Sequence, residues 1–153
     1  MTSPEPTTSQ ELGSEQQALV DALEAEHSAV FGYGVVAAFA DPSRAGEVAA
    51  DAAAHRARRD GTIDALQAAG VTPPVAAPGY TVPFPVTDPV EAARLAVQIE
   101  SDTAIAWRSV VERARSEATR GNALDALREA ALRAARWRVV EGVPPTVAFP
   151  GRP

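Results

Sequence analysis

Three residues that can bind a metal interrupt helix-like stripes of apolar residues along this chain. They are Glu26, which His27 follows directly, then His55 and Glu100. Around each of them apolar residues recur every three or four positions, a spacing that places them on one face of a helix. A carboxylate or imidazole on such a face is costly in a bundle core unless it is paired or bound to a cation. The pattern therefore predicts one polar site inside a helical core.

The stripe around Glu100 is the most regular of the three. Its members are Val90, Ala93, Val97, Glu100, Ala104, Trp107 and Val111. Near the N-terminus Glu26 aligns with Tyr33, while His27 lies on the flank of that stripe. We expect Tyr33 and Trp107 to be aromatic walls of the core or of a pocket beside the polar residues.

The chemistry of the polar site has more than one reading. Two carboxylates that share a core repel each other unless a cation or a proton lies between them. Arg59, one turn after His55, can supply a guanidinium, which pairs well with carboxylates. The alternative is a single metal ion held by Glu26, Glu100 and either His27 or His55. A lone core histidine, by contrast, is more often a hydrogen-bonded structural residue than a ligand.

Capping signals divide the chain into four helices that can position these residues. A Ser-x-x-Gln capping box begins at Ser14, and the run Asp88-Pro89-Val90-Glu91 gives a cap, a proline at the first helical position and an acidic third residue. Asp41-Pro42 and Gly70 end the first two helices, Ser43 caps the second, and Gly121-Asn122 separates the last two. The expected helices, caps included, cover residues 14–40, 43–69, 88–120 and 122–142. Leu124, Leu127, Ala131 and Ala134 are expected to form the apolar face of the last one.

The connector between the second and third helices predicts the topology. Residues 71–87 contain five prolines and, when extended, reach roughly 55 Å, which is enough to run the length of a bundle. The chain is therefore expected to be all-α, a ferritin-like four-helix bundle with a long crossover between helices 2 and 3. Residues 1–13 are expected to be a disordered N-terminal segment, 14–142 the bundle, and 143–153 an extended Pro-rich tail.

Composition restricts the classes of function. The 153 residues include no Cys, so cysteine-based metal or thiol chemistry is excluded. The net charge of −6 argues against a nucleic-acid partner. No run of eighteen apolar residues predicts a membrane span, and a cytoplasmic protein is expected. Ala-rich faces allow helices to approach closely, so a homodimer is expected.

The segments Glu26-His27 with Tyr33, and His55-Arg56-x-Arg58-Arg59-Asp60, together with the Pro-rich connector, resemble the ferritin-like domains of unknown function found in actinobacteria, an Ala-rich family of the DUF4439 type. The resemblance covers residues 15–140.

Metal-binding ferritin-like proteins carry a Glu on each of two helices and a Glu-x-x-His on each of the other two. The resemblance implies that Glu26, Glu100 and His55 match three of these ligands. Ala52 stands where a Glu is expected, and Leu132 stands where Glu129 would be followed by a second His. It therefore implies a degenerate or reduced site for one iron, manganese or zinc ion, and a complete di-iron enzyme centre is not expected.

Three functions remain open on the sequence. The first is a ferritin-like protein with a degenerate or reduced metal site. The second is a structural or interaction bundle, in which the polar core only fixes the register of the helices. The third is a small-molecule binder that uses the polar core as part of a pocket. Because a fold does not determine a function, the sequence leaves all three as hypotheses.

Overall fold

The computed structural model describes residues 11–153, which form four α-helices and no strand. The helices are α1 (Ser14–Phe39), α2 (Ala45–Ala68), α3 (Pro89–Arg113) and α4 (Glu117–Glu141), and a short 3-10 turn (Pro42–Arg44) precedes α2. The expected N-terminal lead-in falls largely on residues 1–10, which lie outside the described residues. None of the described helices is both long and apolar enough to cross a membrane.

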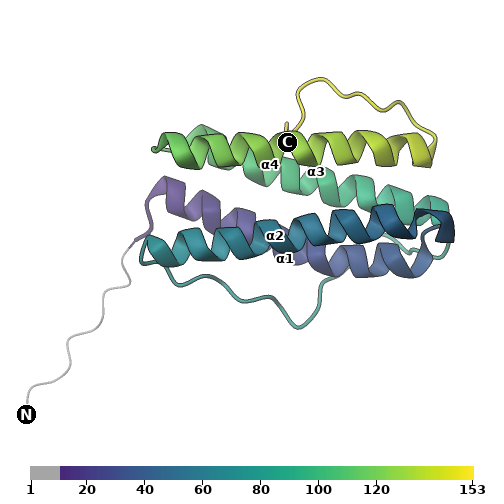
Figure 1. The fold of residues 1–153 in the computed structure, drawn as a ribbon, viewed down its shortest axis with the longest axis horizontal. Coiled ribbons are helices and arrows are strands. Elements are labelled where there is room, and N and C mark those ends of the chain that lie inside the picture. The colour runs from purple at the N-terminus through teal and green to yellow at the C-terminus, as the bar shows by residue number, and fades with distance from the viewer. Residues whose placement is uncertain (1–10) are drawn as a thin grey trace, which may run out of the picture.

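The helices form a bundle of two antiparallel hairpins, α1 with α2 and α3 with α4 (Figure 1). The connector after α2 runs along the bundle before α3 begins, so α2 and α3 point in the same direction (Figure 1). Direct helix packing joins α1 to α2, α1 to α3 and α3 to α4. The expectation of an all-α four-helix bundle with a long crossover between the second and third helices is confirmed.

The start of α3 and the end of α4 follow the signals in the sequence. The carboxylate of Asp88 accepts the backbone N–H of Glu91 at 2.8 Å, and Pro89 is the first helical residue. The carboxylate of Glu91 in turn accepts the backbone N–H of Thr87 at 2.7 Å. Gly142 ends α4 with φ 85°, a left-handed conformation in which a side chain is strained.

Three boundary predictions were wrong: the caps of α1 and α2, and the break between α3 and α4. Ser14 is already helical, and Gly13 occupies the cap position with no side-chain bond. Before α2 it is Asp41, rather than Ser43, whose side chain accepts a backbone N–H.

The break between α3 and α4 falls at residues 114–116 instead of at Gly121-Asn122. The hydroxyl of Ser116 accepts the backbone N–H of Thr119 and starts α4 there. A side-chain cap is a stronger start signal than a glycine, which an exposed helix tolerates at a cost of about 1 kcal/mol.

The buried face of α4 also differs from the expected one. Of the four residues expected there, Leu124 is 48% exposed, Leu127 and Ala131 are partly exposed, and Ala134 is buried. The buried residues of this helix are Ala123, Ala126, Ala130, Arg133, Ala134 and Trp137. Alanines let α4 lie close against α3, so Leu124 and Leu132 turn outward, whereas Leu127 packs partly buried against the core.

The core consists of two apolar clusters with polar residues between them on each helix. The Trp137 cluster contains Ala29, Tyr33, Val36, Val48, Val86, Ala92, Ala93, Leu95, Ala96, Ile99 and Trp137. The Trp107 cluster contains Ala18, Leu19, Ala22, Leu23, Leu66, Trp107, Val110, Ala123 and Ala126. Along each helix a buried polar residue separates the two clusters: Glu26, His55, Glu100 and Arg133. We call these four residues, together with Asp51, the ionic layer.

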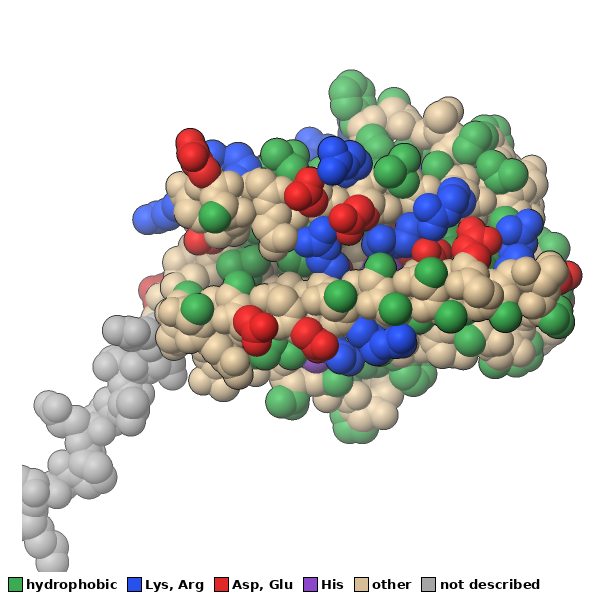
Figure 2. Space-filling view, viewed as in Figure 1, with side chains coloured by type: hydrophobic (Ala, Val, Ile, Leu, Met, Phe, Trp, Pro, Cys, Tyr) green, Lys and Arg blue, Asp and Glu red, His purple; other side chains and the backbone are tan. Residues whose placement is uncertain are grey.

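α2 and α4 are joined by long charged side chains. The guanidinium of Arg58 donates to Asn122 at 2.8 Å and to Glu129 at 2.9 Å. Arg136 reaches back from α4 to Asp51 at 3.0 Å. Charged side chains of both signs follow this face of the molecule (Figure 2). This side of the bundle is therefore held by polar contacts, in contrast to the alanine packing between α3 and α4.

The C-terminal tail, residues 143–153, folds back along the outside of α3 and α4 (Figure 1). Gly151 has φ 80°, and a Cβ there would lie 2.8 Å from the backbone oxygen of Ala104. Only glycine combines this backbone conformation with so close an approach to α3. The tail is thereby seated against the bundle and becomes one wall of a pocket.

Candidate functional site

A fully buried histidine links two fully buried glutamates at the centre of the ionic layer. Nδ1 of His55 lies 2.7 Å from Oε2 of Glu26, and its Nε2 lies 3.0 Å from Oε1 of Glu100. The three side chains are at most 1% exposed. They come from α2, α1 and α3, so the structure brings together three of the residues that the sequence singled out.

His55 must carry a proton on each ring nitrogen to satisfy both neighbours. A neutral imidazole has a single N–H, whereas the two carboxylates each require a donor. Burial lowers the pKa of His55, but the hydrogen bonds and charges of Glu100 and Glu26 outweigh burial and raise the pKa to about 9. At neutral pH this residue is a buried imidazolium cation between two anions.

The two oxygens of Glu100 have very different surroundings. Oε1 accepts three hydrogen bonds: from His55, from the hydroxyl of Tyr33 at 2.5 Å and from Nε of Arg133 at 3.0 Å. Burial raises the pKa of Glu100, but His55, Arg133 and Tyr33 together hold it below its usual range. Oε2 is buried and has no hydrogen-bond partner among the described residues. Glu100 is thus an ionised carboxylate with one saturated oxygen and one unsatisfied oxygen.

Aromatic donors complete the layer on both sides. Nε1 of Trp107 donates to Oε1 of Glu26 at 2.7 Å. Nε1 of Trp137 donates to Asp51 at 2.9 Å, and the hydroxyl of Tyr33 lies 3.4 Å from the same carboxylate. Tyr33 therefore connects Asp51 to Glu100, and burial raises the pKa of Asp51 despite its bonds to Trp137 and Arg136.

Two candidate residues lie away from this site. Nε2 of His27 is 3.0 Å from the backbone oxygen of Pro74, a contact that holds the connector against α1. Nε of Arg59 pairs with the exposed Asp60 at 2.8 Å. Consecutive residues on a helix are separated by about 100°, so His27 cannot share the inward direction of Glu26. The guanidinium that reaches Glu100 comes from Arg133 on α4 instead of Arg59.

Sequence reasoning missed Arg133, Asp51 and Trp137. A signal for the first was present, because Ala123, Ala126, Ala130, Arg133 and Trp137 are spaced alternately by three and four residues. The leucines of α4 suggested a different face. Asp51 lies one turn before His55 on the same face of α2, which is the spacing of neighbouring side chains on a helix.

The donor set does not fit a metal site. Glu26, Asp51 and Glu100 supply three carboxylates, and His55, Arg133 and Arg136 supply three cationic groups against them. A metal-binding imidazole offers a lone pair, whereas both nitrogens of His55 face carboxylates that need donors. Among residues 11–153 no group of three or more His, Asp or Glu is placed to hold a metal ion. The internal charges already compensate one another.

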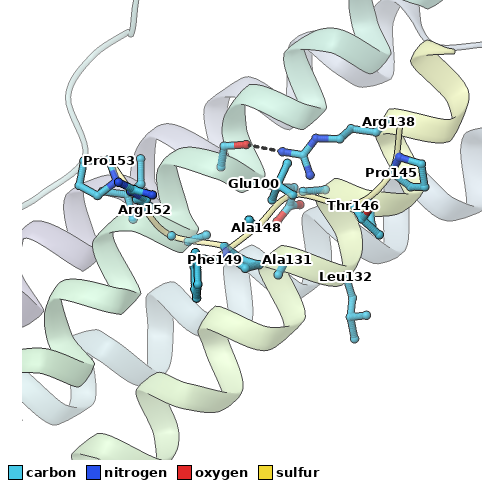
Figure 3. A pocket seen from close by; sticks show the side chains of 18 residues that line it. Glu100, Ala131, Leu132, Arg138, Pro145, Thr146, Ala148, Phe149, Arg152 and Pro153 are labelled. Carbon is cyan, nitrogen blue, oxygen red and sulfur yellow. Dashed lines mark hydrogen bonds between the residues drawn. The ribbon is translucent and has the colours of Figure 1, made fainter. Parts of the chain in front are cut away.

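A pocket of about 470 Å³ reaches this layer from one side, between α3, α4 and the tail (Figure 3). Glu100 lines it, and Arg138 lies at its edge, where its guanidinium is 3.4 Å from the hydroxyl of Ser101 (Figure 3). The helices contribute mainly small apolar side chains to the wall. These are Ala104, Ile105, Ala131, Leu132, Ala134 and Ala135. Glu100, which is 0% exposed, is thus the buried charged residue beneath the wall of a mainly apolar pocket.

Comparisons with known proteins agree on the fold and leave the function open. A family model described as a domain of unknown function, DUF4439, matches residues 18–153. The crystal structure of a conserved hypothetical protein from Mycobacterium tuberculosis is 46% identical in sequence, with a TM-score of 0.82. That alignment covers 85% of this chain and 99% of the other. No curated protein matches the sequence.

Proposed function

This chain belongs to the DUF4439 family of domains of unknown function, and from its geometry we propose that it binds a small molecule in the pocket between α3, α4 and the C-terminal tail. The observation that carries the proposal is that Oε2 of Glu100 is buried and has no hydrogen-bond partner among the described residues. A buried, ionised oxygen without a donor costs about 1–3 kcal/mol or more, and native structures rarely leave such a group unexplained. A ligand that enters the adjoining pocket and displaces the side chains that cover Oε2 supplies the missing donor.

The pocket has the general properties of a ligand site. It is concave, mainly apolar and has few polar groups, which is the usual composition of small-molecule sites. Its volume of about 470 Å³ lies within the range of such sites. The other members of the ionic layer hold Glu100 in place through Oε1, so the acceptor is fixed before a ligand arrives.

In this proposal the bundle is a ferritin-like scaffold whose metal site is degenerate. Glu26, His55 and Glu100 occupy positions that resemble those of metal ligands on ferritin-like helices. The protonated imidazole of His55 and the guanidinium of Arg133 supply the positive charge that a metal would otherwise supply. Because these side chains take the place of a metal ion, the proposed binding function does not involve metal chemistry.

A fragment screen by ligand-observed NMR tests the proposal. We expect the wild-type protein to bind several small apolar compounds that carry a donor. The variant Ala131→Phe places a large side chain in the pocket and should lose them, while Ala118→Phe, an exposed position on the same helix, should retain them.

Two results would contradict the proposal. One is a wild-type protein that binds no fragment, or binds the same fragments when position 131 is Phe. The other is about one metal per chain in protein purified without chelators, which would favour the reduced metal site instead.

A further inference from the structure

We infer that the ligand of this pocket is an uncharged, largely apolar molecule with one hydroxyl group, a phenol or an alcohol, whose O–H donates to Oε2 of Glu100. The inference rests on the proposed function and names the class of compound that the site takes. Three features of the described residues lead to it: the acceptor, the charge balance and the shape of the walls.

The acceptor demands a donor. Oε1 of Glu100 already accepts from His55, Tyr33 and Arg133, whereas Oε2 accepts from none of the described groups. An ionised carboxylate can only accept hydrogen bonds. A ligand group that lacks an O–H or N–H would bury this oxygen unsatisfied, and a ligand carboxylate would add repulsion between like charges.

The charge balance selects a neutral donor over an ammonium group. His55 forms ion pairs with Glu26 and Glu100, and Arg133 pairs with Glu100. Arg136 pairs with Asp51. Arg136 also lies 3.6 Å from Glu47, which pairs with Arg44 at 3.1 Å, so the four carboxylates of this network are already matched by four cations. A ligand ammonium beside Glu100 would be a buried positive charge in excess, which is costly away from water. A hydroxyl group satisfies Oε2 without changing the net charge.

The walls favour an apolar body. Ala104, Ala131 and Ala135 contribute short side chains from α3 and α4, and the tail contributes Val147 and Phe149, which are 46% and 71% exposed. Such shallow surfaces suit a flat ring or a short chain. The other charged side chains of the pocket are Arg138, which is partly exposed, and Arg152, which is exposed, so water screens them from the inner end.

The class of ligand is tested with probes that share one ring system and differ in a single functional group. The protein itself, and so the ionic layer, is left unchanged. Titration calorimetry compares 2-naphthol with 2-methoxynaphthalene, which keeps the ring and loses the donor. Two further probes, 2-(aminomethyl)naphthalene and 2-naphthoate, carry a positive and a negative charge. We expect 2-naphthol to bind the wild-type protein at least about tenfold more tightly than each of the other three, because a hydrogen bond to a charged acceptor is worth about 1.5–3 kcal/mol.

Ala131→Phe should weaken the binding of 2-naphthol by at least about tenfold as well. Ala118→Phe is the matched control and should leave the affinity unchanged. Equal binding of the methyl ether, or tighter binding of the amine, overturns the ligand class while the pocket remains a binding site. If other fragments bind and 2-naphthol does not, the ligand class is overturned in the same way. Binding of 2-naphthol that Ala131→Phe does not change overturns the site itself, and with it the proposed function.

Discussion

The two apolar clusters and the ionic layer between them are equally buried, but they stabilise the bundle in different ways. In the Trp107 and Trp137 clusters the aliphatic side chains contribute by the area that they remove from water, so the loss on truncation is graded by the area lost. In the ionic layer each group is tolerated only because its partners are present. The comparison suggests that the ends of the bundle supply stability, while the middle supplies a fixed arrangement of charges.

Removing His55 should show the contrast most strongly. In His55→Ala, Glu26 and Glu100 face each other without a cation between them, so the free energy of unfolding at pH 7 should fall by about 3–5 kcal/mol. Leu66→Ala, a fully buried apolar control on the same helix, should cost about 2–5 kcal/mol. Urea unfolding followed by circular dichroism at pH 7 and pH 9.5 separates the two. The His55 loss should shrink at the higher pH and the Leu66 loss should not, so equal behaviour would remove the distinction.

The pH dependence of the wild-type protein should report the same histidine. The pKa of His55 is raised from 6.5 to about 9, so its stabilising contribution is fully present below pH 6.5 and is lost as pH rises through about 9. The shift corresponds to about 3 kcal/mol of unfolding free energy. This loss should be absent from His55→Ala, and a wild-type stability that is flat between pH 6.5 and 9.5 would exclude the imidazolium.

Overfilling the alanine contact should cost less than breaking the ionic layer. Ala130 is 1% exposed in the tightly packed face of α4. Ala130→Leu should lower the free energy of unfolding by about 1–3 kcal/mol at any pH, because the added carbons have no space. Ala118→Leu on the exposed side of α4 should stay within about 0.5 kcal/mol. Thermal unfolding of both variants is the measurement, and similar melting temperatures would show that α3 and α4 can separate without cost.

The smallest effect is expected on the polar side of the bundle, between α2 and α4. Arg58 is 18% exposed and its partner Glu129 is 45% exposed, so water screens this pair. Arg58→Ala should cost less than about 1 kcal/mol, and the cost should decline further at high salt. A loss as large as that of His55→Ala would place Arg58 among the coupled groups of the ionic layer.

The sequence was most informative where a local signal determines the structure. The Asp88-Pro89 start of α3, the Gly142 end of α4 and the length of the crossover each depend on nearby residues, and each prediction was confirmed. The stripes around Glu26 and Glu100 placed both carboxylates on inward faces, where the structure has them.

The remaining features depend on packing between helices. Whether Arg59 or Arg133 reaches Glu100 depends on the rotation of α2 and α4 about their axes, and periodicity alone misjudged α4 by following its leucines. The pocket could not be predicted at all. It is formed by the tail, whose path depends on the contact of Gly151 with α3.

The two tryptophans of the chain give the ionic layer a built-in optical reporter. Both are 1% exposed, and each donates its indole N–H to a carboxylate of the layer, Trp107 to Glu26 and Trp137 to Asp51. A negative charge beside the indole N–H shifts the energy of the excited state, so the emission of each ring depends on the charge of its partner. Changes in charge beside Trp107 and beside Trp137 should therefore appear as separate spectral changes, resolved by replacing one tryptophan at a time with phenylalanine.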